Sequence, residues 1–148
     1  MAILDTIQKP YIADRNTEMF IGLDYPLHKS DGSEGYFKST STTIEAVKTN
    51  IKMLLMTEQG ERLMQPTLGL KLRRYLFEQF TSELEIDIQN EIVETINHWL
   101  PFVEIQDIKV GTGQDYDIER NTITVKVDFN ITRDPNTLES VQVQIGES

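Results

Sequence analysis

The residues of this sequence that could support acid–base chemistry are mostly carboxylates, since 24 of its 148 residues are Asp or Glu. Glu78 and Asp87 lie close together in the sequence and flank an expected turn. Two carboxylates are all that glycoside hydrolysis requires, so this pair makes a glycoside hydrolase one hypothesis. A chain this rich in acids contains many such pairs by chance, and no aromatic platform for a sugar accompanies this one. The simpler interpretation places Glu78 at the end of a helix and Asp87 on an exposed face.

Nucleophilic and metal-dependent chemistry finds little support in the residue types. The chain has no cysteine, which excludes disulfides, thiolate nucleophiles and cysteine-bound metals. Its two histidines are His28 and His98, and neither belongs to a recognisable metal-binding or acid–base motif. His98 is expected in the last turn of a helix, where a cation interacts favourably with the helix dipole. We therefore expect no catalytic residues, no metal and no cofactor.

Two short segments resemble fragments of ligand-binding motifs. Gly111-Thr112-Gly113 lacks the third glycine of a dinucleotide-binding loop and leads to no helix, so we interpret it as part of a hairpin loop. Asp115, Asp117 and Glu119 are spaced like calcium ligands. The turn glycine and the downstream bidentate glutamate of a calcium loop are missing, however. We interpret this second segment as a solvated loop tip.

The charge of the chain limits its partners. The formal net charge is −10, which argues against a nucleic-acid-binding protein because such proteins need a basic surface. Lys71, Arg73 and Arg74 form a local basic cluster, interpreted as a solvated or ion-paired face. No segment approaches the roughly 20 apolar residues that span a bilayer, and the N-terminus lacks the features of a signal peptide. We expect a soluble protein made in a reducing cytoplasm, with no nucleic acid, membrane or small-molecule substrate as a partner.

A first long helix is expected to begin at Thr42, which forms a capping box with Glu45. Apolar residues follow at helical spacing, and Gly60 is expected to end the helix because glycine takes the left-handed conformation without steric cost. The connection that follows is expected to be a rigid structural corner. The residues expected to shape it are Gly60, Arg62, Pro66 and Gly69.

A short helix is expected over residues 70–78, and a second long helix after it. Ser82 and Glu85 form another capping box. Apolar residues then recur at almost every turn until Pro101, which ends the helix. Val93 and Leu100 widen this stripe, which predicts that the second long helix is buried over more than half of its circumference.

From Phe102 onward the apolar residues follow a period of two, which predicts three strands. The period slips near Gln106-Asp107 in the first strand, which indicates a β-bulge. The clearest strand covers residues 122–131, and Asp134-Pro135-Asn136 is expected to be a turn before a last strand, Val141–Ile145. Helices followed by strands predict an α+β fold in which the helices pack on one face of a small antiparallel sheet. We expect one domain over residues 41–148 and a partly irregular N-terminal arm over residues 1–40.

One segment carries a more specific signature. It has an apolar helix end, a threonine, a Gly-Glu-Arg turn, a proline, a glycine and then Leu-Phe-Glu. The residues are Leu54-Leu55-Met56-Thr57-Glu58-Gln59-Gly60-Glu61-Arg62-Leu63-Met64-Gln65-Pro66-Thr67-Leu68-Gly69, followed by Leu72 and Leu76-Phe77-Glu78. This pattern resembles the baseplate wedge family of contractile tails, the sheath initiators of contractile-tailed phages with counterparts in type VI secretion baseplates. The similarity extends from about Ile21 to the C-terminus.

The resemblance implies a structural protein, present in six copies around the tail, in a baseplate assembled in the host cytoplasm. It implies the tail sheath protein, other wedge subunits and tail tube or hub proteins as partners. Many family members carry Glu-Pro-Arg in the loop that docks the wedge bundle, and this chain has Leu100-Pro101-Phe102 there. Docking through this loop would therefore use apolar contacts. Some relatives have been labelled lysozymes, so a cell-wall hydrolase using Glu78 and Asp87 is the alternative.

The last strand is the surface on which we expect the sheath to begin. It carries no charge between Glu139 and Glu147, and no lysine or proline interrupts it. Open strand edges of this kind invite pairing with another chain. The residues of the expected edge are Val141, Gln142, Val143, Gln144 and Ile145. The alternatives are that the N-terminal arm covers this strand or that the strand lies in the middle of the sheet.

Overall fold

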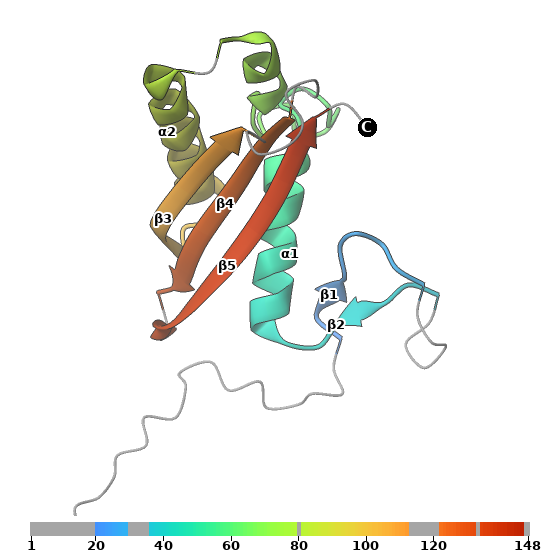
Figure 1. The fold of residues 1–148 in the computed structure, drawn as a ribbon. Helices are drawn as coiled ribbons and strands as arrows, with labels where there is room; N and C mark the ends of the chain where they lie inside the picture. The colour runs from blue at the N-terminus through green and yellow to red at the C-terminus, as the bar shows by residue number, and fades with distance from the viewer. Residues whose placement is uncertain (1–19, 30–35, 80, 113–121, 133, 147–148) are drawn as a thin grey trace, which may run out of the picture.

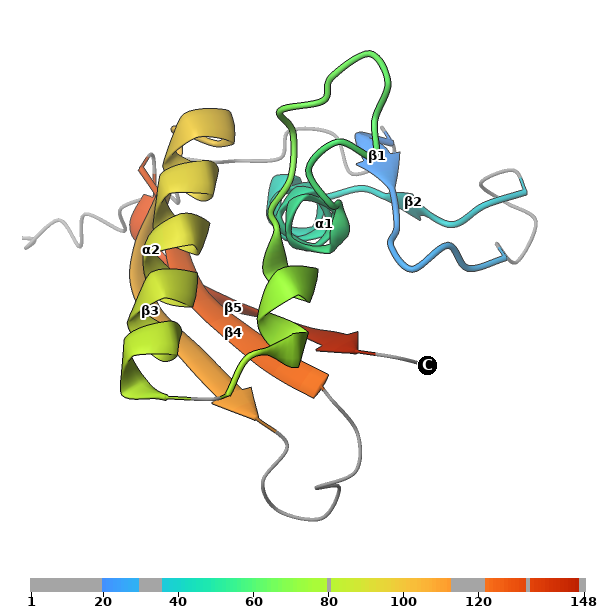
Figure 2. The ribbon, with the colours of Figure 1, turned by 90° about the horizontal axis from the view of Figure 1, so that it is seen from above.

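The C-terminal strands form a three-stranded antiparallel sheet, and two long helices pack on one face of it (Figures 1 and 2). The computed structural model describes residues 20–29, 36–79, 81–112, 122–132 and 134–146. The α+β class and the placement of the helices on one face are confirmed. The segment with Asp115, Asp117 and Glu119, which we interpreted as a solvated loop tip, lies outside the described residues, as does Gly113.

Helix α1 covers Thr43–Met56, and the Thr42 hydroxyl accepts a hydrogen bond from the Glu45 amide at 3.3 Å, as the capping box predicts. The helix ends earlier than expected, because its C-terminal cap is Thr57 and not Gly60. The Thr57 hydroxyl and amide both donate to the Met53 carbonyl, at 2.6 and 3.0 Å. The Thr57 carbonyl in turn accepts from the Leu70 amide at 3.0 Å. These bonds divert the chain away from the helix before Gly60 is reached.

The short helix η1 is a 3-10 helix over Leu72–Phe77, shorter than the range 70–78 expected from the sequence. It starts later because Leu70 forms a bridge with Glu58 and is held in extended backbone. Helix α2 covers Ser82–Trp99. The expected cap at Ser82 is wrong by one residue: the Thr81 hydroxyl accepts from the Leu84 amide at 3.3 Å. Adjacent Thr and Ser are both good caps, so the sequence alone did not decide between them.

The sheet has the order β3–β4–β5, with β3 at Val103–Thr112, β4 at Thr122–Ile131 and β5 at Asp134–Gly146. The register of β3 and β4 shifts between Ile105 and Asp107, which confirms the predicted bulge. The expected turn at residues 134–136 is wrong. Asp134 already pairs with Ile131, so β5 begins there and has 13 residues. A closely paired hairpin therefore extends the last strand well beyond Val141–Ile145.

Strands β1 (Gly22–Leu23) and β2 (Ser39–Thr40) form a small antiparallel hairpin within the region expected to be an arm. The Ile21 amide donates to the Thr40 carbonyl at 2.8 Å. The hairpin lies beside the first part of α1, away from the large sheet (Figure 1). Residues 1–19 of the expected arm lie outside the described residues.

The core lies between the inner face of the sheet and the two helices. Each layer contributes the apolar residues that the sequence periods placed on one side. The buried residues of the helices are Val47, Ile51, Leu54, Leu55, Leu84, Ile88, Ile92 and Ile96, and those of the sheet are Val103, Ile108, Val110, Ile123, Val125, Val127, Phe129, Ile131, Val141 and Val143. Burial of this apolar surface holds the sheet and both helices together as one unit.

Candidate docking surfaces

Strand β5 lies at an edge of the sheet, as expected, so the alternative that it lies in the middle of the sheet is excluded. Val141 and Val143 are buried against the core, whereas Gln142 and Gln144 are exposed on the open face. Within the described part of the chain, the backbone of residues 138–146 forms hydrogen bonds only with β4. One side of β5 therefore presents free backbone donors and acceptors.

The two edges of the sheet differ in character. Strand β3, at the other edge, carries the bulge at Gln106 and the ion pair between Lys109 and Asp107. Bulges and charged side chains are the usual means by which proteins prevent pairing at an edge. Strand β5 has neither between Val141 and Ile145. Of the two edges, β5 is the one open to strand addition.

The corner between α1 and η1 is held by backbone hydrogen bonds from several directions. The Gly60 amide donates to the Pro66 carbonyl at 2.8 Å, and the Gln59 amide donates to the Leu70 carbonyl at 3.0 Å. The Gln65 amide donates to the Arg62 carbonyl at 3.2 Å. The ends of the corner are tied by the bridge between Glu58 and Leu70. These contacts favour one fixed shape for the segment that we expected to be rigid.

Both glycines of the corner have positive φ angles, 94° at Gly60 and 104° at Gly69. Their surroundings differ. A Cβ atom at Gly69 would lie 2.2 Å from the Thr57 carbonyl oxygen, whereas a Cβ atom at Gly60 would have no atom within 4 Å. Gly69 therefore allows two backbone segments to approach closely, and Gly60 is required only for its conformation.

The tip of the corner exposes its side chains almost completely. Leu63 and Met64 have exposed fractions of 95% and 96%. Arg62 precedes them and is also exposed. Among the described residues, its guanidinium has no hydrogen-bond or ion-pair partner.

The loop after α2 lies close to the corner. Leu100 is the C-terminal cap of α2, and its carbonyl accepts from the Val103 amide at 2.9 Å. The Phe102 carbonyl accepts hydrogen bonds from the amide and the hydroxyl of Thr132, at 3.0 and 3.1 Å. Pro101 and Phe102 are exposed. The backbone of this predicted docking loop is therefore fixed, the Leu100 side chain packs against the core, and the side chains of Pro101 and Phe102 are exposed.

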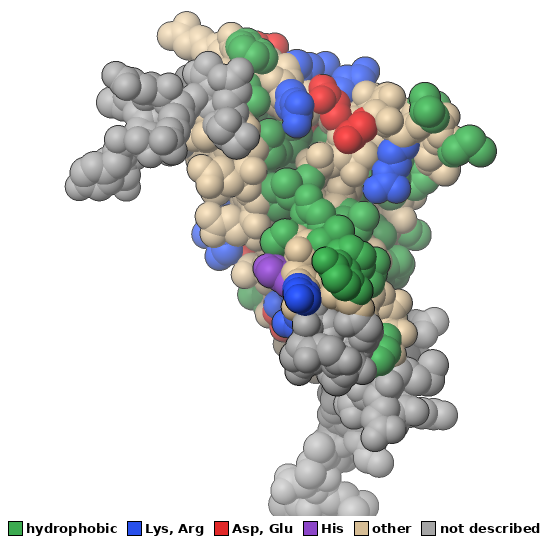
Figure 3. All heavy atoms as spheres, turned by 90° about the vertical axis from the view of Figure 1, so that its right-hand side faces the viewer, with side chains coloured by type: hydrophobic (Ala, Val, Ile, Leu, Met, Phe, Trp, Pro, Cys, Tyr) green, Lys and Arg blue, Asp and Glu red, His purple; other side chains and the backbone are tan. Residues whose placement is uncertain are grey.

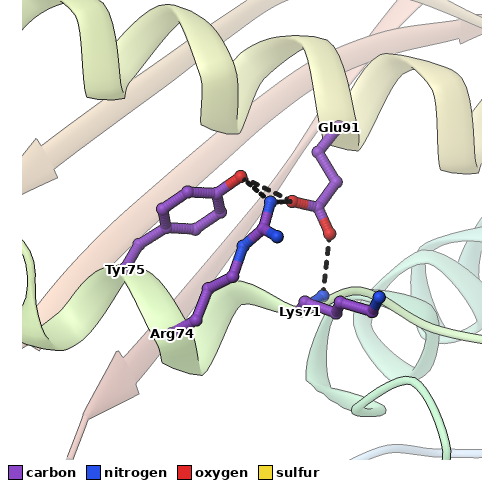
Figure 4. Close-up of polar contacts among 4 residues, drawn as sticks. All are labelled: Lys71, Arg74, Tyr75 and Glu91. Atoms are coloured by element: carbon purple, nitrogen blue, oxygen red, sulfur yellow. Dashed lines mark hydrogen bonds and ion pairs between the residues drawn. The ribbon is translucent and has the colours of Figure 1, made fainter.

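Glu91 of α2 joins η1 to α2 through three hydrogen bonds (Figure 4). Its carboxylate accepts from the Lys71 amide at 2.8 Å, from the Arg74 guanidinium at 3.1 Å and from the Tyr75 hydroxyl at 2.8 Å. The Arg74 guanidinium also donates to the Tyr75 hydroxyl. Burial raises the pKa of the Tyr75 phenol, so it stays protonated and able to donate. Arg73 pairs with Glu58, which confirms the ion-paired interpretation for Arg73 and Arg74.

The residues considered for catalysis do not converge in the structure. Glu78 is the C-terminal cap of η1 and Asp87 lies on the outer side of α2, both exposed as the simpler interpretation predicts. His98 is in the last turn of α2 with its ring edge-to-face against Trp99, and His28 lies 3.5 Å from Asp24 in the hairpin region. No group of three or more potential metal ligands occurs among the described residues. None of the described helices is long and apolar enough to cross a membrane.

Comparison with known sequences decides the family. The sequence model of the family described as baseplate wedge protein gp25 matches residues 41–136. The chain belongs to the gp25 family of baseplate wedge proteins. Baseplate wedge protein gp25 of Enterobacteria phage T4 is 24% identical over 111 residues, which cover 74% of this chain and 80% of the T4 protein. The family predicted from the Leu54–Glu78 signature is confirmed, and this gp25-family chain is a structural subunit of a contractile-system baseplate.

Solved structures share the fold of this gp25-family chain. A protein of the anti-feeding prophage baseplate superposes with a TM-score of 0.61 at 24% identity, covering 77% of this chain and 86% of that one. A protein of the type VI secretion baseplate complex gives 0.54 at 14% identity, covering 71% and 93%. A Geobacter sulfurreducens protein provisionally named a tail lysozyme gives 0.63 at 19% identity, covering 74% and 95%. These likenesses establish a common fold.

Proposed function

We propose that this chain is a non-enzymatic wedge subunit on which sheath assembly begins, by addition of a sheath strand to the free edge of β5. The observation that carries the proposal is that edge. Strand β5 has 13 residues, pairs with β4 on one side only, and has no charged residue, lysine or proline over Val141–Ile145. Main-chain hydrogen bonds supply affinity when a strand adds to an open edge.

The structure beside β5 supports a rigid template. The Lys48 ammonium of α1 pairs with the Glu139 carboxylate of β5, which ties the helix to the edge strand. Near the other end of β5, Ile145 and Gly146 line a small cavity of about 90 Å³ together with Met56 and Arg73. An edge strand tied to α1 by this ion pair presents its backbone groups in fewer arrangements, which reduces the ordering cost of adding a strand.

The loop Leu100–Phe102 is proposed to contact the other wedge subunits and, through them, the tube or hub. Its exposed Pro101 and Phe102 side chains offer apolar contact, and Phe102 has an exposed fraction of 41%. The proposal therefore assigns two surfaces to the chain, one for the sheath and one for the wedge. The particle is proposed to assemble in the host cytoplasm.

Proline substitution in β5 tests the sheath surface. Successive residues of a strand direct their amides to opposite edges, so Gln142→Pro and Val143→Pro remove donors on different sides. The variant that loses the outward donor should fold, enter the baseplate and give tubes without sheath, since proline cannot donate to the added strand. Gln142→Ala and Val143→Ala control for the lost side chains. Normal sheathed tails from both proline variants would exclude the β5 edge as the template.

The non-enzymatic part of the proposal has a separate test. Glu78→Gln combined with Asp87→Asn removes the only carboxylate pair that the sequence nominates. Purified protein should release no product from cell-wall substrate, and the double variant should assemble normal tails. Wall-degrading activity in the unmodified protein that disappears in the double variant would establish the hydrolase instead.

A further inference from the structure

A groove of about 220 Å³ lies between α1, the corner and the end of α2. Figure 2 shows the corner leaving α1, looping outward and returning between α1 and α2 to η1. The groove is lined by Met53 and Leu54 of α1, by Arg62 and Leu68 of the corner, and by Trp99 and Leu100 at the end of α2. Two features predicted separately from the sequence, the corner and the docking loop, therefore share one surface.

The size of the groove favours a side chain as its occupant. Pockets for small molecules usually measure roughly 300–1,000 Å³, and this groove is smaller. Its walls are mostly apolar, and they include Trp99 and Arg62. Tryptophan and arginine are enriched among the residues that contribute most to protein–protein binding. The groove is suited to an anchoring side chain from another protein.

The charges around the groove indicate which polar group of the partner lies beside the anchoring side chain. Arg73 and Arg74 each pair with a carboxylate, at 3.6 and 3.1 Å. Arg62 is the third arginine of the described residues, and it forms no ion pair with a carboxylate among them. This is notable because the chain is strongly acidic, with a net charge of −10. A guanidinium beside apolar walls recognises a carboxylate well, because it offers a planar fork of donors.

The tip of the corner follows the groove residue Arg62 in the chain. Leu63 and Met64 follow Arg62 directly and leave 95% and 96% of their surfaces exposed. Figure 3 shows that hydrophobic side chains also gather over α1 and the β1–β2 hairpin, on the side of the molecule that carries α1. The tip differs from that patch because its backbone is fixed by the bonds around Gly60 and Pro66 and a cation stands next to it. Apolar and cationic groups placed together are complementary to a segment that carries both apolar and acidic side chains.

We propose that the groove binds a segment of a neighbouring wedge subunit that inserts an apolar side chain between Trp99 and Leu54 and places an aspartate or glutamate on Arg62. Leu63 and Met64 cover the rest of that segment. This assignment rests on the proposed contact between the Leu100–Phe102 loop and the wedge. It adds the chemistry of the partner and makes Arg62 the residue that selects it.

Charge reversal tests the role of Arg62. Full-length Arg62→Glu is co-expressed with the wedge subunits of the same particle, and the amount recovered in wedge complexes is measured. Recovery should fall about tenfold or more, as expected when a charged anchor is lost. Lys29→Glu makes the same charge change on the hairpin and should leave recovery unchanged. Equal recovery of Arg62→Glu and Lys29→Glu would overturn the proposal.

Crosslinking identifies the occupant. A photoreactive p-benzoylphenylalanine replaces Leu63 in assembled baseplates, and the crosslinked peptide is sequenced by mass spectrometry. The expected product is a wedge-subunit peptide with an aspartate or glutamate within about four residues of the crosslink, the span of one helical turn. A crosslink to the sheath, to a second copy of this chain or to a peptide without a carboxylate, or no crosslink at all, would each contradict the assignment.

The two proposals fail in different ways. If the β5 edge does not start the sheath, the proline variants give sheathed tails while Arg62→Glu still loses wedge recovery. If the groove is not a wedge site, Arg62→Glu enters wedge complexes normally while the outward proline variant still lacks sheath. Thermal unfolding of each variant confirms that it is folded before either assay.

Discussion

The edge of β5 and the tip of the corner are both candidate docking surfaces, and they offer opposite kinds of contact. The edge presents backbone donors and acceptors, and its apolar side chains Val141 and Val143 are buried in the core. The tip is closed by backbone hydrogen bonds, including the one from the Gln65 amide to the Arg62 carbonyl, and presents the side chains of Arg62, Leu63 and Met64. Backbone pairing accepts many sequences, whereas a fixed set of side chains selects one partner.

This contrast fits a subunit that contacts two different kinds of partner. In the proposed function the sheath begins on the β5 edge, and backbone pairing there places little demand on the sequence of the added strand. The proposed wedge contact depends instead on the side chains of Arg62, Leu63 and Met64, which select their neighbour. Substitutions that perturb one surface or its supporting contacts and leave the other surface intact test this contrast.

Replacing Gly69 with alanine should cause the largest loss of stability. The new Cβ atom would lie 2.2 Å from the Thr57 carbonyl oxygen, and φ at this residue is 104°. The backbone would have to move, and we expect the free energy of unfolding to fall by more than about 3 kcal/mol, the strain of a left-handed residue plus steric overlap. Urea unfolding measures this. A loss below about 1 kcal/mol would show that the close approach is relaxed in solution.

Replacing Glu91 with alanine should have the next largest effect. The variant removes the acceptor for the Lys71 amide, the Arg74 guanidinium and the Tyr75 hydroxyl. We expect a loss of about 2 kcal/mol, because hydrogen bonds to a charged group contribute about 1.5–3 kcal/mol. Glu94→Ala, on an exposed part of the same helix, is the control. Equal melting temperatures for the two variants would show that η1 is held by packing alone.

The Gly60→Val variant tests backbone strain without steric overlap of the new side chain. The position has a φ of 94° and open space around it, so only backbone strain should matter. We expect a loss of more than about 1 kcal/mol, the cost of a left-handed conformation for a residue with a side chain. Gly111→Val also has open space but no positive φ and should not show this strain. An unchanged melting temperature for Gly60→Val would contradict a rigid corner.

Lysines on β5 should affect assembly and leave stability almost unchanged. Gln142→Lys combined with Gln144→Lys places two charges on exposed positions of the edge strand, and exposed substitutions usually change stability by less than about 0.5 kcal/mol. Lysines on an edge oppose pairing with another strand, so sheath assembly on isolated baseplates should slow. The double alanine variant controls for loss of the amides. Equal assembly rates in the lysine and alanine variants would argue against strand addition.

The fold was predictable wherever one period dominated the sequence. The stripe from Leu84 to Ile96 and the alternation from Ile123 to Ile131 each reflect burial on one side of a regular element, and burial of apolar surface is the dominant driving force of folding. The ends of elements were less predictable because nearly equal choices compete there. Thr81 and Ser82 can both cap α2, and the helix before Gly60 ends early because Leu70, far along the chain, bonds Thr57.

The candidate surfaces were only partly predictable for the same reason. The edge residues Val141–Ile145 follow from their composition, although the sequence did not decide that β5 is an edge strand. The groove depends on Arg62 and Trp99 meeting across 37 positions of sequence, and no local pattern encodes that meeting. Glu91 was missed entirely, because its partners lie 16 to 20 residues away on another element. Its only sequence signal was the nearby basic cluster.

The bridge between Glu58 and Leu70 makes the length of the corner independent of the rest of the fold. The chain leaves the body of the domain at Glu58 and returns beside it at Leu70, so the segment between them is a closed loop resting on the fold. Residues inserted between Leu63 and Met64 would lengthen a loop whose closure cost grows only slowly with length. Such an insertion would change how far the tip extends from the domain and leave the pairing of Glu58 with Leu70 in place.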